Sequence, residues 1–138
     1  MVPLMVAGLL FFWFTNAGCN QSSARQQQNK GSQTIESVDA SRFKQLVESS
    51  ECVLVDVRTP EEYRAGHIEG ARLMNIYDPD FVRKVEDLPK DKAICVYCRS
   101  GNRSMRAAHI LAEKGFKKIY NLSGGIRAWQ HKGYPVER

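Results

Sequence analysis

Residues 93–104 read AICVYCRSGNRS, and this stretch decides how the rest of the chain is organised. Its first five residues, Ala93–Tyr97, are mostly β-branched, aromatic or otherwise apolar, which predicts a short buried strand. Cys98 follows where that strand ends, residues 99–103 form a tight polar turn, and Ser104 opens a helix rich in Ala, Met and Leu. The stretch therefore predicts a strand, a turn and a helix with a cysteine at the first junction.

A cysteine at this junction has chemical surroundings that favour the thiolate. The backbone N–H groups of the turn and the positive end of the helix dipole both stabilise negative charge on Cys98. Gly101 allows a positive φ, so the loop can point its N–H groups inward. We interpret Cys98 as a nucleophile in an anion-binding cradle made of Arg99, Ser100, Gly101, Asn102, Arg103 and Ser104.

Other roles for the cysteines and histidines stay open. A cysteine in or after a buried strand is often a small hydrophobic residue, the role we assign to Cys52 and Cys95. The Cys95-x-x-Cys98 spacing also suggests a redox pair, which we disfavour because Cys95 is predicted in mid-strand. The histidines show no metal-ligand spacing and are expected at a turn or on the surface: His67, His109 and His131.

The composition is that of a globular protein. The chain has 138 residues, of which 43% are hydrophobic and 25% charged, enough for one domain with one core. Its net charge of +5 comes from Lys and Arg spread along the sequence, without the dense basic tract of a nucleic-acid binder. A small anionic substrate explains this charge equally well, and we expect no nucleic-acid partner.

The N-terminus resembles an export signal. Residues 1–14 are almost wholly apolar and uncharged, but too short for a spanning helix of ~20 residues, which is typical of the apolar region of a signal peptide. The small residues 17–18 before Cys19 resemble a bacterial lipoprotein signal, in which Cys19 is lipidated and becomes the mature N-terminus. Two features differ from that signal. Asn16 lies three residues before the cysteine, where the signal usually has an aliphatic residue, and no Lys or Arg precedes the apolar run. The alternative is a plain secretory signal cleaved after Ala17 or Gly18.

These features divide the chain into three parts. We predict a signal peptide at residues 1–18, a flexible Gln/Ser/Asn-rich tether at 19–33 and a folded domain at 34–138. The tether would span roughly 20 Å as a flexible coil. We therefore expect a protein exported to the periplasm or the cell-envelope membrane surface, held there by a lipid on Cys19.

Strand and helix signals alternate along the folded part. Besides the central strand, apolar runs predict strands at residues 34–38, 53–57, 72–75 and 117–122. Short helices are predicted after Asp39 and Thr59, at residues 79–86, from Ser104 and at residues 126–130. Strands that alternate with short helices imply a three-layer α/β/α domain with a mainly parallel five-stranded sheet.

The end of the second predicted strand carries polar residues. Asp56 and Arg58 lie where that strand ends, which is the usual place for function in open α/β sheets, so we expect them to support the site from behind. Thr59, Pro60 and Glu62 then give three agreeing signals for a helix start: an N-cap, a proline at the first position and a capping box.

Three segments resemble the signatures of single-domain rhodaneses. They are residues 56–71 (DVRTPEEYRAGHIEGA), residues 98–103 (CRSGNR), and residues 121–129 (NLSGGIRAW) with 133–136 (GYPV) after them. The resemblance covers the chain from Thr34 to its end. It implies that Cys98 carries a sulfane sulfur as a persulfide, taken from a small anionic donor such as thiosulfate and passed to cyanide or a thiol. Arg99 and Arg103 would hold the donor, no metal or organic cofactor is needed, and a monomer is expected.

Two alternatives remain beside this interpretation. Phosphatases and arsenate reductases of the same fold place five residues between the cysteine and the arginine, whereas four separate Cys98 from Arg103, so the loop is one residue short for phosphate. Rhodanese-like binding modules typically lack the cysteine, which is present in this chain. A sulfur carrier that serves a partner protein stays open.

Overall fold

The structure is a computed structural model that describes residues 31–138. The predicted signal peptide at residues 1–18, Cys19 and most of the predicted tether lie outside the described residues. Export, lipidation and the cell-envelope location therefore stay predictions. Within residues 31–138, no helix is long and apolar enough to cross a membrane.

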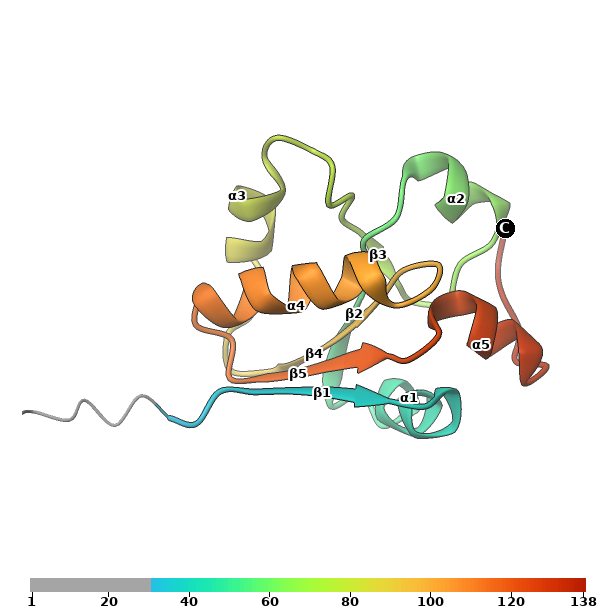
Figure 1. Cartoon of the computed structure of the whole chain (residues 1–138), viewed down its shortest axis with the longest axis horizontal. Helices are drawn as coiled ribbons and strands as arrows, with labels where there is room; N and C mark the ends of the chain where they lie inside the picture. The colour runs from blue at the N-terminus through green and yellow to red at the C-terminus, as the bar shows by residue number, and fades with distance from the viewer. Residues whose placement is uncertain (1–30) are drawn as a thin grey trace, which may run out of the picture.

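Five parallel strands form one sheet in the order β1-β5-β4-β2-β3 (Figure 1). The strands are β1 (Thr34–Val38), β2 (Cys52–Asp56), β3 (Arg72–Leu73), β4 (Ala93–Tyr97) and β5 (Lys118–Leu122). The central strand β4 is bonded on both sides and four of its five residues are buried, as its apolar sequence predicts. The predicted five-stranded sheet is confirmed, and its named strands are all parallel.

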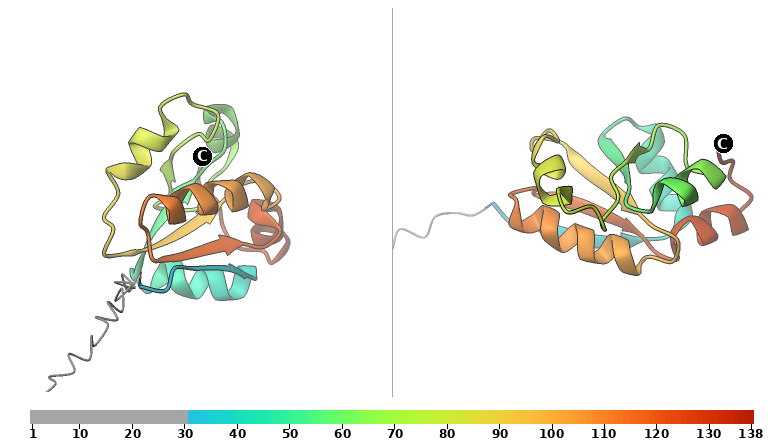
Figure 2. Two further views of the ribbon diagram at one scale, coloured as in Figure 1. Left: turned by 60° about the vertical axis from the view of Figure 1, so that its left-hand side comes forward. Right: turned by 90° about the horizontal axis from the view of Figure 1, so that it is seen from above.

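Helices cover both faces of the sheet (Figure 2). The helices are α1 (Ala40–Glu48), α2 (Pro60–Ala65), α3 (Phe81–Glu86), α4 (Asn102–Glu113) and α5 (Gly125–His131). One core cluster joins α3 and α4 to the sheet, and a second joins α1 and α5 to the opposite face. Alternate residues of β4 belong to different clusters because successive side chains of a strand point to opposite faces. The three-layer α/β/α architecture is thus confirmed.

The helix starts follow the predicted capping residues. Asp39 caps α1 by accepting a hydrogen bond from the backbone N–H of Arg42 at 2.8 Å. At α2, the Thr59 side chain accepts from the N–H of Glu62, and the Glu62 carboxylate accepts from the N–H of Thr59. This reciprocal capping box fixes the Glu62 side chain at the start of α2.

Three predicted boundaries were wrong by a few residues. Helix α4 begins at Asn102 rather than Ser104, because Gly101 adopts φ 104° and turns the chain into the helix two residues earlier. The edge strand β3 has two residues rather than four, since only Arg72 and Leu73 pair with β2. Helix α3 begins at Phe81 rather than residue 79, after a turn closed by the Phe81 N–H and the Asp78 carbonyl.

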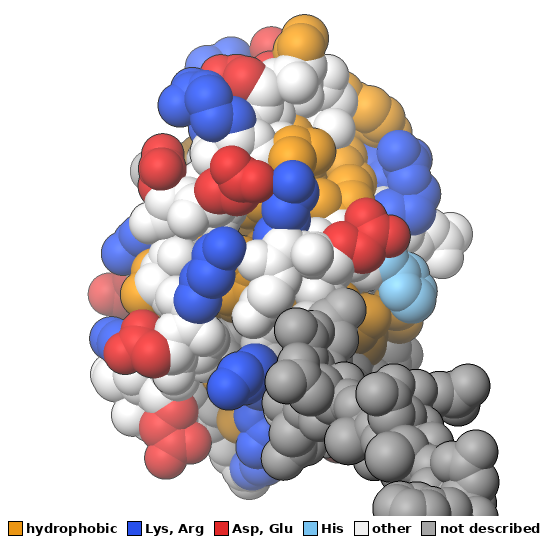
Figure 3. All heavy atoms as spheres, turned by 90° about the vertical axis from the view of Figure 1, so that its left-hand side faces the viewer, with side chains coloured by type: hydrophobic (Ala, Val, Ile, Leu, Met, Phe, Trp, Pro, Cys, Tyr) orange, Lys and Arg blue, Asp and Glu red, His pale blue; other side chains and the backbone are white. Residues whose placement is uncertain are grey.

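Acidic and basic side chains are intermixed on the face of the molecule shown in Figure 3. Ion pairs join neighbouring side chains within α2 and at the start of α3: Arg64–Glu61, Arg83–Asp80 and Lys84–Asp80.

Candidate active site

Cys98 lies directly after β4, at the edge where the parallel strands end. Its side chain is buried, with 1% of the residue exposed. The thiol sulfur lies 3.1 Å from the backbone nitrogen of Gly101 and 3.3 Å from the hydroxyl oxygen of Ser104. The positive φ of Gly101 turns its N–H toward the sulfur, as the sequence predicts.

These contacts determine the acidity of the thiol. Burial alone raises the pKa of Cys98, because a buried thiolate loses its hydration. Hydrogen bonds from the Ser104 hydroxyl and from the backbone N–H groups of Ser104, Gly101 and Ser100 lower it. The net pKa of Cys98 lies below its usual value. The loop therefore favours the nucleophilic form of the cysteine.

The Ser104 hydroxyl can donate a hydrogen bond to either of two acceptors. Its oxygen lies 3.1 Å from the Gly101 carbonyl oxygen as well as within reach of the sulfur. That carbonyl also accepts from the backbone N–H of Met105 and from the Asn121 side-chain amide. The hydroxyl can therefore turn to a thiolate without leaving the Gly101 carbonyl unpaired.

Replacing Ser104 should make Cys98 less acidic. We expect Ser104→Ala to move the pH profile of Cys98 alkylation to higher pH and to slow alkylation at neutral pH about five-fold, since a hydrogen bond worth about 1 kcal/mol to the thiolate is lost. The measurement is the rate of alkylation by iodoacetamide as a function of pH. Ser100→Ala is the matched control, because Ser100 acts through its backbone N–H and its side chain is exposed. Equal pH profiles for Ser104→Ala and the wild type would contradict this role.

Helix α5 is docked against the Cys98 loop through its backbone. The Ile126 N–H donates to the Cys98 carbonyl at 2.9 Å, and the Arg127 N–H donates to the Arg99 carbonyl at 3.3 Å. A Cβ atom on Gly125 would lie 2.4 Å from the carbonyl carbon of Arg99. Only glycine allows this approach, which brings Arg127 close to Arg99.

Arg103 is engaged by Glu62. Its two terminal nitrogens lie 2.8 and 2.7 Å from the two carboxylate oxygens of Glu62, a bidentate pair between α4 and α2. The exposed Tyr77 ring lies over the guanidinium, 5.8 Å from centroid to carbon. Hydrogen bonding to Arg103 lowers the pKa of Glu62 to about 2. The charge of Arg103 is therefore compensated within the protein, a feature that the sequence did not predict.

The low pKa of Glu62 predicts a pH-dependent contribution to stability. A carboxylate with a depressed pKa stabilises the fold above its unfolded pKa, near 4.3, and loses that effect as the pH falls toward 2. We expect Glu62→Gln to lower the free energy of unfolding by about 1–2 kcal/mol at neutral pH, with the difference shrinking below about pH 4.

Urea unfolding at neutral and acidic pH measures this difference. Glu61→Gln is the control, because the Glu61 side chain is 76% exposed and should matter little at any pH. A Glu62→Gln effect that does not change with pH would refute the ion pair as its cause.

Asp56 and Arg58 form a buried ion pair behind the loop. The exposed fractions of these residues are 0% and 5%, and the Arg58 Nη2 atom lies 2.7 Å from an Asp56 carboxylate oxygen. The same nitrogen donates to the Gly66 carbonyl at 2.7 Å. The guanidinium also lies 5.5 Å from the Tyr97 ring, at the end of β4. The pair thus ties the end of β2 to the end of α2, and its support of the site stays a prediction.

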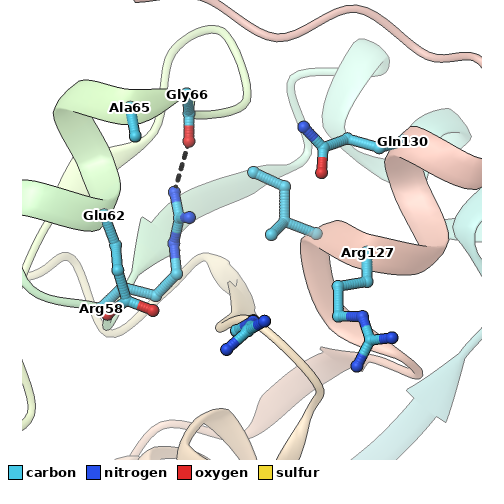
Figure 4. A pocket seen from close by; sticks show the side chains of 8 residues that line it. Arg58, Glu62, Ala65, Gly66, Arg127 and Gln130 are labelled. Atoms are coloured by element: carbon cyan, nitrogen blue, oxygen red, sulfur yellow. Dashed lines mark hydrogen bonds between the residues drawn. The ribbon is translucent and has the colours of Figure 1, made fainter.

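A hollow of about 350 Å³ opens beside the Cys98 loop. Figure 4 shows Arg58 and Glu62 on one side of it and Arg127 and Gln130 of α5 on the other. The lining residues come from the segment after β2, from α2, from the Cys98 loop and from α5: Arg58, Glu62, Ala65, Gly66, Arg99, Ile126, Arg127 and Gln130. The site thus combines an acidic thiol with a neighbouring cationic hollow.

Residues 39–132 match the family described as Rhodanese-like domain. The chain belongs to this family. A protein named Sulfurtransferase from Allochromatium vinosum is 34% identical over 103 residues, which are 74% of this chain and 94% of that protein. Thiosulfate sulfurtransferase 18 from Arabidopsis thaliana is 37% identical over 115 residues, with 74% of this chain and 83% of that protein covered.

Solved structures agree with this assignment. The crystal structure of a rhodanese-related protein from Thermoplasma volcanium is 30% identical, with a TM-score of 0.66 over 74% of this chain and 97% of that chain. The solution structure of a rhodanese-like domain from Anabaena is 34% identical, with a TM-score of 0.63 over 73% of this chain and 77% of that chain. The chain is therefore a member of the rhodanese-like sulfurtransferase family.

The sheet separates two other cysteines, Cys52 and Cys95, from Cys98. Cys95 belongs to the core cluster on one face of the sheet, whereas Cys98 belongs to the cluster on the other. The neighbouring Cys52 thiol and burial both raise the pKa of Cys95, so it stays a thiol. This geometry argues against a Cys95–Cys98 redox pair and favours the predicted packing role of Cys95.

The histidines lie where the sequence places them. His67 stacks on Tyr63, with the ring centroids 3.7 Å apart, and its Nδ1 atom lies 3.0 Å from the Tyr63 carbonyl oxygen. Its backbone is paired with Glu137 near the end of the chain. His109 and His131 are exposed. Within the part of the chain that the structure describes, no three His, Cys, Asp or Glu side chains are grouped as metal ligands.

Sequence reasoning missed Arg127, Gln130 and the partnership of Glu62 with Arg103. The signal for Arg127 was Gly124-Gly125, since two glycines before a helix indicate a close backbone approach. Glu62 and Arg103 are 41 residues apart, and neither residue type indicates its partner.

Proposed function

We propose that this protein transfers a sulfane sulfur from a small anionic donor such as thiosulfate to a thiol or cyanide through a persulfide on Cys98. The observation that carries the proposal is the Cys98 sulfur, whose pKa is lowered by the loop hydrogen bonds beside a cationic hollow. The family membership and the sulfurtransferase names of two relatives support the same reaction class.

In the first half-reaction, the Cys98 thiolate attacks the outer sulfur of thiosulfate. A sulfur–sulfur bond forms to Cys98, the sulfur–sulfur bond of thiosulfate breaks, and its electron pair leaves with sulfite. The persulfide keeps one negative charge, which the N–H groups of Gly101 and Ser104 can stabilise. The persulfide also extends the buried side chain by about 2 Å toward an acceptor.

In the second half-reaction, the acceptor attacks the outer sulfur of the persulfide. The electron pair of the broken sulfur–sulfur bond stays on Cys98, which returns to the thiolate. The same hydrogen bonds that stabilise the attacking thiolate therefore stabilise the leaving thiolate of the second step. This symmetry suits a residue that both receives and releases sulfur.

Steady-state kinetics test this scheme. Because the donor product leaves before the acceptor reacts, double-reciprocal plots should give parallel lines when thiosulfate and cyanide are varied. Thiosulfate alone should release sulfite in an amount equal to the enzyme. Intersecting lines, with sulfite released only when cyanide is present, would contradict a persulfide intermediate.

A further inference from the structure

The cations that line the hollow differ in whether their charge is compensated. Arg58 is paired with Asp56, and the lining residue Glu62 is paired with Arg103. Among residues 31–138, neither Arg99 nor Arg127 has an ion pair or a side-chain hydrogen bond, and both are exposed. The uncompensated charge of the hollow therefore comes from Arg99 and Arg127.

The backbone keeps these two arginines together. Arg99 follows the nucleophile directly, and its carbonyl accepts the hydrogen bond from the Arg127 N–H. Arg127 also lines a second hollow of about 450 Å³ with Ser100 and His131, so open space surrounds it on two sides. Both guanidinium groups are thus free to meet a ligand that enters the hollow next to the Cys98 loop.

The hollow is larger than thiosulfate or cyanide requires. Its volume of about 350 Å³ is within the range of pockets for small organic molecules, about 300–1,000 Å³. Gln130 adds a side-chain amide on the α5 side (Figure 4), which can bond a peptide-like group. The hollow therefore suits an organic molecule that carries negative charge and polar amides away from its sulfur.

We infer that Arg99 and Arg127 select the sulfur acceptor by charge, favouring low-molecular-weight thiols with carboxylates over neutral or cationic thiols of the same shape. The inference rests on the proposed function, since it concerns the second half-reaction. The acceptor thiolate attacks the outer sulfur of the Cys98 persulfide and leaves as an acceptor persulfide, while Cys98 keeps the electron pair of the broken bond. Arg99 and Arg127 hold the carboxylates during this attack.

The test compares glutathione with its diethyl ester, which keeps the thiol and the peptide bonds but lacks the carboxylates. The full chain is loaded with thiosulfate and desalted, and loss of the persulfide is followed by intact mass after mixing with each thiol. The quantity of interest is the ratio of the two second-order rate constants. Comparing this ratio between variants cancels the intrinsic reactivities of the two thiols.

We expect Arg127→Gln to lower the preference for glutathione about five-fold and Arg99→Gln/Arg127→Gln to lower it further, with the ester rate little changed. High salt should reduce the wild-type preference, because exposed charges are screened. Lys132→Gln is the control, since this exposed cation ends α5 outside the hollow. Its preference should equal that of the wild type.

The outcomes separate this inference from the proposed function. If thiosulfate loads no sulfur, the proposed function fails. The persulfide could form while the wild type, Arg127→Gln and the double variant all give the same ratio of rate constants. Selection by charge would then be overturned, and the proposed function would stand. If Lys132→Gln loses as much preference for glutathione as Arg127→Gln, the inference is also overturned, because the effect would then come from net charge alone.

Discussion

Cys98→Ser should abolish sulfur transfer while leaving the fold intact. The serine hydroxyl is not ionised near neutral pH, so the loop hydrogen bonds would have no anion to stabilise. We expect the thiosulfate-dependent rate to fall at least about 10³-fold, the usual consequence of removing a nucleophile. The measurement is the rate of thiocyanate formation from thiosulfate and cyanide, with circular dichroism to verify the fold.

Cys95→Ser is the matched control for this variant. Cys95 is three residues away and equally buried, but it packs on the other face of the sheet. We expect it to keep most of the activity and to lose about 1 kcal/mol of stability. If Cys95→Ser is as inactive as Cys98→Ser, the assignment of a single nucleophile is wrong.

Asp56→Ala should produce the largest loss of stability. The substitution leaves the Arg58 guanidinium buried without its carboxylate, with only the Gly66 carbonyl and the Tyr97 ring as partners. Removing one member of a buried ion pair costs about 3–5 kcal/mol. Chemical denaturation of the wild type and the variant measures the difference in the free energy of unfolding.

Two further variants identify the cause of this loss. Asp56→Ala/Arg58→Met should regain much of the stability, because the uncompensated charge is removed as well. Asp78→Ala removes one partner of a more exposed pair with Lys84 and should change stability little. Equal losses for Asp56→Ala and Asp78→Ala would contradict the buried pair as a main stabilising contact.

The sequence predicted the parts of the fold that depend on local patterns. The apolar run at β4 predicted a buried central strand, and Thr59 with Glu62 predicted the capping box at α2. The position of Cys98 after a strand and before a glycine-bearing turn likewise predicted its contact with a backbone N–H group, although not the one with the Ser104 hydroxyl. Each of these features depends on residues within a few positions of one another, so the pattern carries the information.

The features that the sequence did not predict depend on distant contacts. Arg103 was expected to hold the donor, but the structure pairs it with Glu62, which the capping box already orients. Arg127 lies beside Arg99 because Gly125 permits the approach of α5 to the loop. Binding of the donor by Arg103 stays a prediction, because Arg103 would have to contact the donor and Glu62 at the same time.

Intact mass spectrometry of the full chain after thiosulfate treatment tests the central claim most directly. We predict a mass gain of one sulfur atom, located on the peptide that contains Cys98, removed by cyanide and absent from Cys98→Ser. No mass gain, or a sulfur atom found on Cys52 or Cys95 instead, would contradict a persulfide mechanism at Cys98.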